Sequence, residues 1–250
     1  VLFSFIYLVY RMFMAMRNIA REPKCKFQLS SLPPEDVLLT FLVFVILFSR
    51  LWVIRTLPLP LWGDSYQHTL ITQLILNHNG LFTNWQPYAE LQSLTYHFGF
   101  HTQAAVFGWL THQPGAESVL AFGQIANVLA VLALYPLAAH LTKDRRWAGV
   151  MAVLMAGLVF TMPFQYTNWG RYTQLSGQVI LPVVVWFTWQ TVESPRFRWL
   201  NLLPAALAWT GLALTHYRVL MLAVFFPFIL FFFSIQDRKS TRLNSSHGKL

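Results

Sequence analysis

The sequence has 250 residues, of which 56% are hydrophobic and only 11% are charged. A soluble domain carries about 25% charged side chains, so this chain has too little charge to cover a water-facing surface. Its 22 phenylalanines and 10 tryptophans suit hydrocarbon and the membrane interface. The composition therefore excludes an ordinary soluble domain and predicts an all-α, polytopic transmembrane helical bundle.

The two ends of the chain differ from the rest. The sequence begins at Val1 within an apolar run, and residues 237–250 change abruptly to a polar, basic segment that we interpret as a non-native or disordered tail. Residues 238–250 hold four of the 18 basic residues, so without them the formal net charge falls from +9 to +5. The high pI thus gives no reason to expect a nucleic-acid partner. The single cysteine, Cys25, excludes an internal disulfide framework.

A helix that crosses a bilayer needs about 20 mostly apolar residues. The sequence predicts one transmembrane domain over residues 1–236. Its candidate spans lie at about 1–16, 37–55, 117–141, 147–163, 176–192, 199–215 and 219–236. Pro33 and Pro34, followed by two acidic residues, give the second span a sharp start.

Basic residues set the orientation. If the apolar stretch 96–111 does not cross, the cluster at 143–146 lies on the same side as the basic residues of 11–26. The positive-inside rule prefers this arrangement, which makes 56–116 a long extracytoplasmic segment. Helical spacing predicts an amphipathic helix over 65–79, ended by Asn79-Gly80, and the aromatic stretch 96–111 suits the interface. We therefore expect two interfacial helices on the extracytoplasmic face of an integral membrane protein.

The polar residues that could carry chemistry gather on the extracytoplasmic side. Six of the eight histidines fall there, with three carboxylates. Asp64 follows a span and lies four residues before His68, so both would share one helix face. Asp64 could accept a proton or hold a divalent cation such as Mg²⁺ or Mn²⁺. It could equally be the N-cap of the helix that follows.

Two short polar turns between spans each contain an arginine. In Asn168-Trp-Gly-Arg-Tyr-Thr-Gln174, Arg171 lies between Trp169 and Tyr172. This turn is either a phosphate and sugar site or an interfacial aromatic anchor with a snorkelling arginine. In Thr215-His-Tyr-Arg218, the Arg218 side chain could bind a phosphate and His216 could orient it, with Tyr217 beside them. The alternative is a tight turn with a polar tip.

Weaker candidates occupy the 56–116 segment. His97 and His101 are four apart, a spacing that can chelate a metal, but an interfacial helix with two polar positions explains them as well. Glu90 could be a second acidic ligand. Inside a span, Gln124 and Asn127 are expected to bond to neighbouring helices.

Over residues 37–236 the chain resembles the GT-C superfamily of membrane glycosyltransferases. This superfamily includes the protein O-mannosyltransferases and the lipid A aminoarabinose transferases. The resemblance rests on an Asp that opens an extracytoplasmic helix, on the flat helix of Tyr96-His-Phe-Gly-Phe-His101, and on the two arginine-containing turns. The sequence departs from better-known members in lacking an acidic pair in its first loop.

The resemblance implies transfer of a sugar from a polyprenyl-phosphate carrier to an extracytoplasmic acceptor at the bilayer. Asp64 would be the general base or a metal ligand, and the arginines would stabilise the departing phosphate. The substrate-binding set implied is His68, Glu90, His97, His101, Trp169, Arg171, Tyr172, His216, Tyr217 and Arg218. Two other classes remain open at this point: a transporter or lipid flippase without catalysis, and a non-catalytic membrane scaffold. The sequence names no protein partner.

Overall fold

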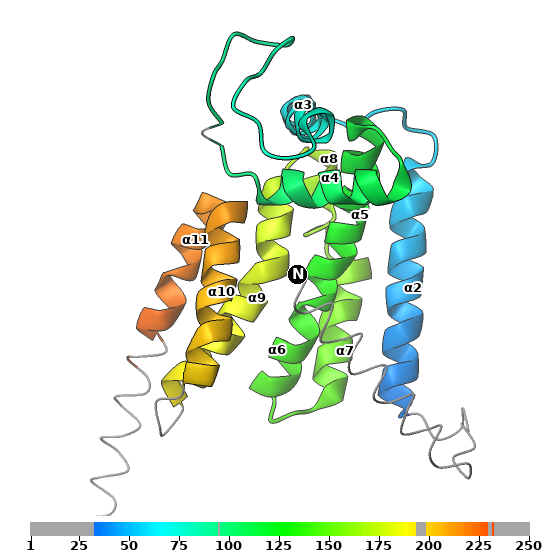
Figure 1. Ribbon diagram of the computed structural model, residues 1–250. Coiled ribbons are helices and arrows are strands. Elements are labelled where there is room, and N and C mark those ends of the chain that lie inside the picture. The colour runs from blue at the N-terminus through cyan, green and yellow to red at the C-terminus, as the bar shows by residue number, and fades with distance from the viewer. Residues whose placement is uncertain (1–32, 95, 194–198, 230–231, 233–250) are drawn as a thin grey trace, which may run out of the picture. The chain divides into compact units, whose positions relative to one another are not determined.

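The computed structural model describes residues 33–94, 96–193, 199–229 and 232 (Figure 1). The chain divides into two units, residues 1–37 and 38–250, and all of the described residues after Val37 belong to the second. The predicted span 1–16, the basic residues around Cys25 and the tail 237–250 lie outside the described residues. Within those residues every regular element is a helix, which confirms the predicted all-α helical bundle.

Three helices are long and apolar enough to cross a membrane. They are α2 (Pro34–Ile54), the run Gly115–Leu141 formed by α5 (Gly115–Leu132) and α6 (Leu134–Leu141), and the part Tyr172–Val192 of α9 (Tyr172–Glu193). They match the predicted spans 37–55, 117–141 and 176–192. Three further predicted spans, 147–163, 199–215 and 219–236, correspond in the described residues to shorter apolar helices at Arg146–Val159, Leu202–Thr215 and Tyr217–Ile229.

The helix that follows α6 changes its geometry near its end. It begins as α7 (Arg146–Leu154), continues as the π-helical turn η2 (Met155–Val159), and is followed by the short α8 (Gln165–Asn168). Helix α7 packs against α6, and an apolar core joins it to α2 and α5 through Ile46, Val131 and Val150. The opposite face of α2 exposes large apolar side chains such as Phe41, Phe44 and Phe48, as expected where lipid is the solvent.

A buried arginine ties α2 to the π-helical turn. Arg50 is 9% exposed; its Nε donates to Asn127 Oδ1 (3.1 Å) and its Nη2 to the Gly157 carbonyl (2.7 Å). The guanidinium also lies 4.3 Å from the centre of the Phe164 ring. Asn127 donates in turn to the Pro163 carbonyl (3.0 Å), which confirms that it bonds to a neighbouring segment. A charge buried among apolar helices needs such partners, so Arg50 is a structural clamp.

Helix α9 is the central element on the other side of the bundle. It packs against α5, against α10 (Trp199–Thr215) and against α11 (Tyr217–Ala223). Where α5 crosses α9, Gly123 lies against the ring of Tyr172, and any larger residue would collide with that ring. Tyr172 also stacks on Phe100, with ring centroids 5.4 Å apart. These contacts fix the N-terminal end of α9, which matters because Arg171 directly precedes it.

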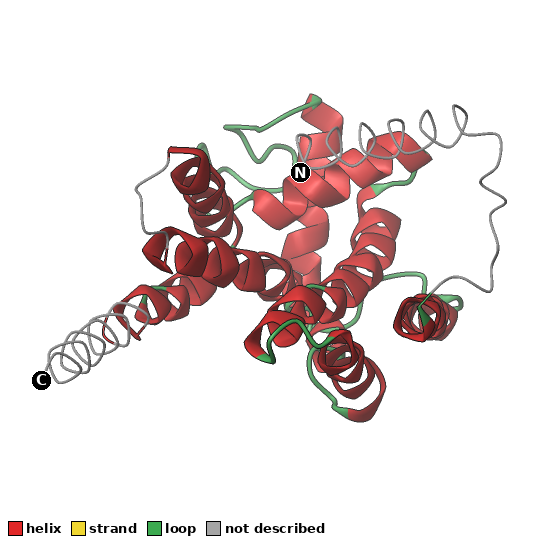
Figure 2. Cartoon of the chain, turned by 90° about the horizontal axis from the view of Figure 1, so that it is seen from below, coloured by secondary structure: helices red, strands yellow, loops and turns green. Residues whose placement is uncertain are grey.

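The 56–116 segment contains the two predicted helices, α3 (Gly63–His78) and α4 (Gly99–Thr111). Both end at a left-handed residue, Asn79 and His112 respectively. With 16 and 13 residues, neither is long enough to count as a span. Helices α3 and α4 lie together across one end of α5 and α9 (Figure 1). Viewed from below, some helices are seen nearly end on while others lie across them (Figure 2).

Candidate functional site

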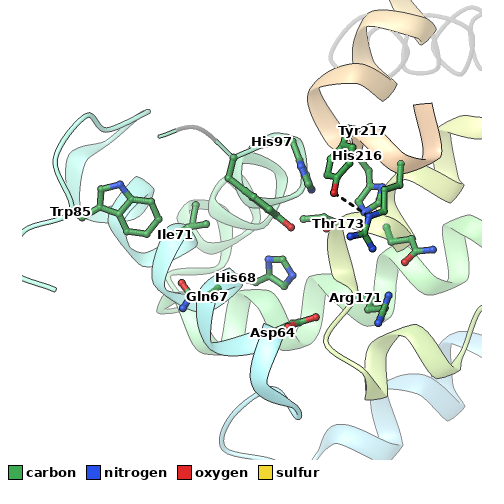
Figure 3. A pocket seen from close by; sticks show the side chains of 13 residues that line it. Asp64, Gln67, His68, Ile71, Trp85, His97, Arg171, Thr173, His216 and Tyr217 are labelled. Atoms are coloured by element: carbon green, nitrogen blue, oxygen red, sulfur yellow. Dashed lines mark hydrogen bonds between the residues drawn. The ribbon is translucent and has the colours of Figure 1, made fainter. Parts of the chain in front are cut away.

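A cavity of about 450 Å³ opens at the end of the bundle covered by α3 and α4. Four separate stretches of chain supply its walls: one face of α3, the loop between α3 and α4, the start of α9 and the turn between α10 and α11 (Figure 3). The lining residues are Asp64, Gln67, His68, Ile71, Trp85, Tyr96, His97, Arg171, Thr173, Gln174, His216, Tyr217 and Arg218.

Asp64 is the second residue of α3 rather than its cap. The helix begins at Gly63, and the N-cap position belongs to Trp62, whose side chain makes no capping bond. The cap prediction is therefore wrong, because the helix starts two residues earlier than the sequence indicated. As an acid in the first turn, Asp64 still complements the helix dipole. In the described part of the chain its carboxylate forms no salt bridge, so it is available to a ligand.

The Gly170 turn brings Arg171 beside Asp64. Gly170 has a left-handed backbone (φ +65°), and an added Cβ would lie 2.5 Å from Ser65 Oγ and 2.8 Å from the Ser65 backbone nitrogen. Only glycine can pack this closely against the first turn of α3 in that conformation. Figure 3 shows Asp64 and Arg171 at neighbouring positions on the cavity wall. The glycine thus joins two segments that are more than 100 residues apart in sequence.

The second arginine comes from the turn between α10 and α11. His216 caps α11, and its Nδ1 accepts from the Val219 backbone N–H (3.2 Å). Gly177 of α9 packs against this cap. A Cβ added at Gly177 would lie 3.2 Å from the His216 Cβ, which is a tight contact. The next residues point into the cavity, where Arg218 Nε donates to the Tyr217 hydroxyl (3.0 Å). Helix α9 therefore positions both arginine-containing turns.

Two buried histidines form a pair at the cavity wall: His68 lines the cavity and His101 lies behind it. His68 Nδ1 and His101 Nε2 are 2.9 Å apart, and His101 is fully buried. With both rings neutral, one nitrogen of the pair carries the shared proton. One ring donates and the other accepts, so the contact joins α3 to α4 at the cavity wall.

Burial keeps the histidines of the cavity uncharged at neutral pH. Desolvation lowers the pKa of His68, His97 and His216 to about 4 in each case. Asp64 opposes this effect at His68, whereas His97 and the two arginines add to it at His216. The charged groups that line the cavity are then one carboxylate and two guanidinium groups. Their sum, −1 + 2, is a net charge of +1, which favours an anionic ligand.

Seven of the predicted site residues line the cavity: Asp64, His68, His97, Arg171, His216, Tyr217 and Arg218. His101 and Tyr172 lie behind the wall, with 0% and 1% exposure, so they support the site without lining it. Glu90 and Trp169 are exposed and do not line the cavity; Trp169 instead lies 5.9 Å from the Arg171 guanidinium. His97 precedes α4, so it does not share a helix face with His101.

Six residues that were not predicted individually as site residues also line the cavity: Gln67, Ile71, Trp85, Tyr96, Thr173 and Gln174. Thr173 and Gln174 belong to the polar turn that was predicted as a candidate site, and a signal existed for two of the others. Gln67 and Ile71 follow Asp64 by three and seven positions, which is the spacing of one helix face. Trp85 has no such signal, because it lies in a loop without periodicity.

The donor set does not fit a resident divalent metal. Among the described residues no three His, Cys, Asp or Glu side chains lie close enough to hold a metal ion. Asp64 is the one carboxylate of the cavity, and two arginines share the site with it. Mg²⁺ and Mn²⁺ prefer several oxygen ligands, so the arginines are the groups that could neutralise an anion here.

The fold and the cavity define a helical membrane protein with a polar, cationic pocket at one end of its bundle. The chain belongs to the family described as "Family of unknown function (DUF6541)", which matches residues 2–249. No curated protein and no solved structure matches the chain.

Proposed function

We propose that this protein is an integral membrane glycosyltransferase that moves a sugar from a polyprenyl-phosphate donor to an extracytoplasmic acceptor. One observation carries the proposal: Asp64, Arg171 and Arg218, from three distant segments, line a single cavity of about 450 Å³. A base and two phosphate-binding cations are the groups that such a transfer needs. The volume is within the usual range for small-molecule sites, about 300–1,000 Å³.

The arginines bind the phosphate that links the sugar to its lipid. A phosphodiester carries one negative charge, which the net charge of +1 in the cavity balances. During transfer a second negative charge develops on the departing phosphate, and preformed cations stabilise that charge more than they stabilise the ground state. Removing one such donor typically costs about 3–4 kcal/mol of transition-state stabilisation. The neutral histidines leave both guanidinium groups free for this task.

Asp64 receives the proton in the same step. The acceptor hydroxyl oxygen forms a bond to the anomeric carbon, and the bond from that carbon to the phosphate oxygen breaks. The electron pair leaves with the polyprenyl phosphate, and the hydroxyl proton goes to the Asp64 carboxylate. A single displacement needs only one carboxylate, which is the number that the cavity offers.

The charge distribution favours an extracytoplasmic site in a plasma membrane. The basic turn at Lys143, Arg145 and Arg146 lies between α6 and α7, at the end of these helices away from α3 and α4 (Figure 1). By the positive-inside rule this turn faces the cytoplasm, so the cavity opens on the other side. A bacterial plasma membrane would supply the lipid-linked sugar there.

A transporter would require ionisable groups along a path through the bilayer. Arg50 is the buried charge of the described spans, and its hydrogen bonds to Asn127 and Gly157 make it a clamp between helices. It also lies only four residues from the end of α2. These contacts favour catalysis over transport.

The test is a transfer assay with the full chain in proteoliposomes that contain radiolabelled polyprenyl-phosphate sugars and an envelope extract as acceptor. Asp64→Asn should lower the transfer rate at least about a hundredfold, the range of a lost general base, with unchanged donor binding. Arg55→Gln, on an exposed side chain outside the cavity, is the matched control. Normal transfer by Asp64→Asn would refute the proposal.

A further inference from the structure

The cavity has two chemically different ends. In Figure 3, Arg171, His216 and Tyr217 lie on one side, and Ile71 and Trp85 lie on the opposite side. The wall between them is one face of α3, which carries Asp64, Gln67 and His68. From Asp64 to Ile71 this face runs about 10 Å, since a helix rises 1.5 Å per residue. The cavity is thus longer than one sugar ring, and only one of its ends is cationic.

Trp85 lines the second end of the cavity, and its side chain is held in one orientation. The residue is 8% exposed, and its Nε1 donates to the Ser93 carbonyl (2.8 Å), so the indole cannot rotate freely. Phe82 packs edge-on against the indole, with ring centroids 5.3 Å apart. Both rings belong to the core cluster that includes Ile71 on α3. The small part of the indole that is exposed is therefore a fixed aromatic surface at this end of the cavity.

The reaction geometry determines which substrate uses this end. In a single displacement the nucleophile enters opposite the leaving group. If the phosphate lies at the arginines, the acceptor hydroxyl must approach from the side away from them, which is the side of Ile71 and Trp85. This step rests on the proposed function, because it takes the arginine end as the donor phosphate site.

We propose that Trp85, Gln67 and Ile71 form the acceptor subsite, and that the acceptor group bound there is a carbohydrate ring. The apolar face of a pyranose stacks on the indole, and the Gln67 amide bonds to its hydroxyl groups as both donor and acceptor. The reacting hydroxyl then lies next to Asp64, which takes its proton as the oxygen bonds to the anomeric carbon. The bond between the anomeric carbon and the phosphate oxygen breaks, and its electron pair leaves with the phosphate.

A carbohydrate fits these residues better than a peptide does. Peptide grooves bind an extended backbone through exposed strand edges or by packing a helix into an apolar groove. The described residues of the 79–98 loop contain no strand. A flat ring wall beside an amide and a carboxylate instead matches a ligand that is apolar on its face and hydroxylated at its edge. The acceptor is therefore the sugar of a glycan or glycolipid.

The experiment is saturation-transfer NMR on the full chain in nanodiscs. The probes are methyl glycosides of the common hexoses and pentoses, together with a Ser- and Thr-containing octapeptide. We expect at least one glycoside to bind. Its Kd should rise about tenfold in Trp85→Leu, which loses the stacking wall, and about fivefold in Gln67→Leu, which loses a hydrogen bond.

One control separates this subsite from the rest of the protein. Tyr88→Leu changes an exposed ring in the same loop that does not line the cavity, and it should leave the glycoside Kd unchanged. Gln67 is exposed on α3, so its variant tests the subsite even if Trp85→Leu fails to fold.

Several results would overturn the assignment: no glycoside binds, a glycoside binds equally to both variants, or only the peptide binds in a Trp85-dependent way. The last result would mark a protein acceptor. If Asp64→Asn abolishes transfer but no glycoside binds, the acceptor subsite fails and the proposed function stands. If glycosides bind through Trp85 while Asp64→Asn transfers sugar normally, the proposed function fails instead.

Discussion

Gly170 joins the arginine turn to α3, so its replacement by alanine should destabilise the protein markedly. An alanine at φ +65° costs roughly 1–2 kcal/mol in the left-handed region. Its Cβ would also lie 2.5 Å from Ser65 Oγ and 2.8 Å from the Ser65 backbone nitrogen, so the turn must move away from α3. Overpacking of this kind costs about 1–3 kcal/mol. Together these effects lower the free energy of unfolding by about 2–5 kcal/mol.

Equilibrium unfolding of the purified chain in detergent, with increasing SDS, measures this loss. Gly211→Ala in α10 is the matched control, because an added Cβ there meets no atom within 4 Å. Alanine in the middle of a helix is favoured over glycine by roughly 0.5–1 kcal/mol, so this variant should be neutral or slightly more stable. If Gly170→Ala is as stable as the parent chain, the contact between this turn and α3 does not exist and the cavity is wrongly built.

Two further predictions concern the helix contacts and the histidines. Arg50→Met should lower the free energy of unfolding by about 2–4 kcal/mol, because it leaves buried acceptors on Asn127 and Gly157 without a donor. Arg55→Met, on an exposed side chain, should change the free energy of unfolding by less than about 1 kcal/mol in the same titration. Equal losses of stability in the two variants would refute the structural role of Arg50. The pKa of His68, His97 and His216 is about 4 in the fold and about 6.5 in an unfolded chain. Between these pH values the unfolded state binds more protons than the folded state, so Tm should fall as the pH is lowered from about 6.5 toward 4. Above about pH 6.5 these histidines are neutral in both states and should not change Tm. A Tm that does not fall over this range would contradict their burial.

The helices and their order were predictable because hydropathy and turn residues act locally. The spans 37–55, 117–141 and 176–192 each contain enough apolar residues to cross a bilayer, and Asn79 ends α3 where predicted. The clustering of histidines and arginines at one end followed from counting residues on each side of the predicted spans. Seven of the residues predicted for the site line the cavity.

The errors occurred where tertiary contacts decide the outcome. Asp64 resembles a cap in sequence, yet Trp62, which has a positive φ, occupies that position. His101 and Tyr172 have polar atoms typical of a site, but α4 and α9 bury them behind the cavity wall. Trp85 reaches the cavity because its loop folds back on α3, a contact that no periodic pattern encodes.

The proposed site depends on Arg171 and Arg218 binding the same phosphate group, and a double-mutant cycle tests this directly. The Kd of a short-chain polyprenyl phosphate would be measured in nanodiscs for the parent chain, Arg171→Gln, Arg218→Gln and the double variant. Both arginines are exposed, so the variants should fold normally. If one phosphate bridges both side chains, the effects are coupled by more than about 0.5 kcal/mol. Strictly additive effects, or no effect of either variant, would contradict a shared phosphate site.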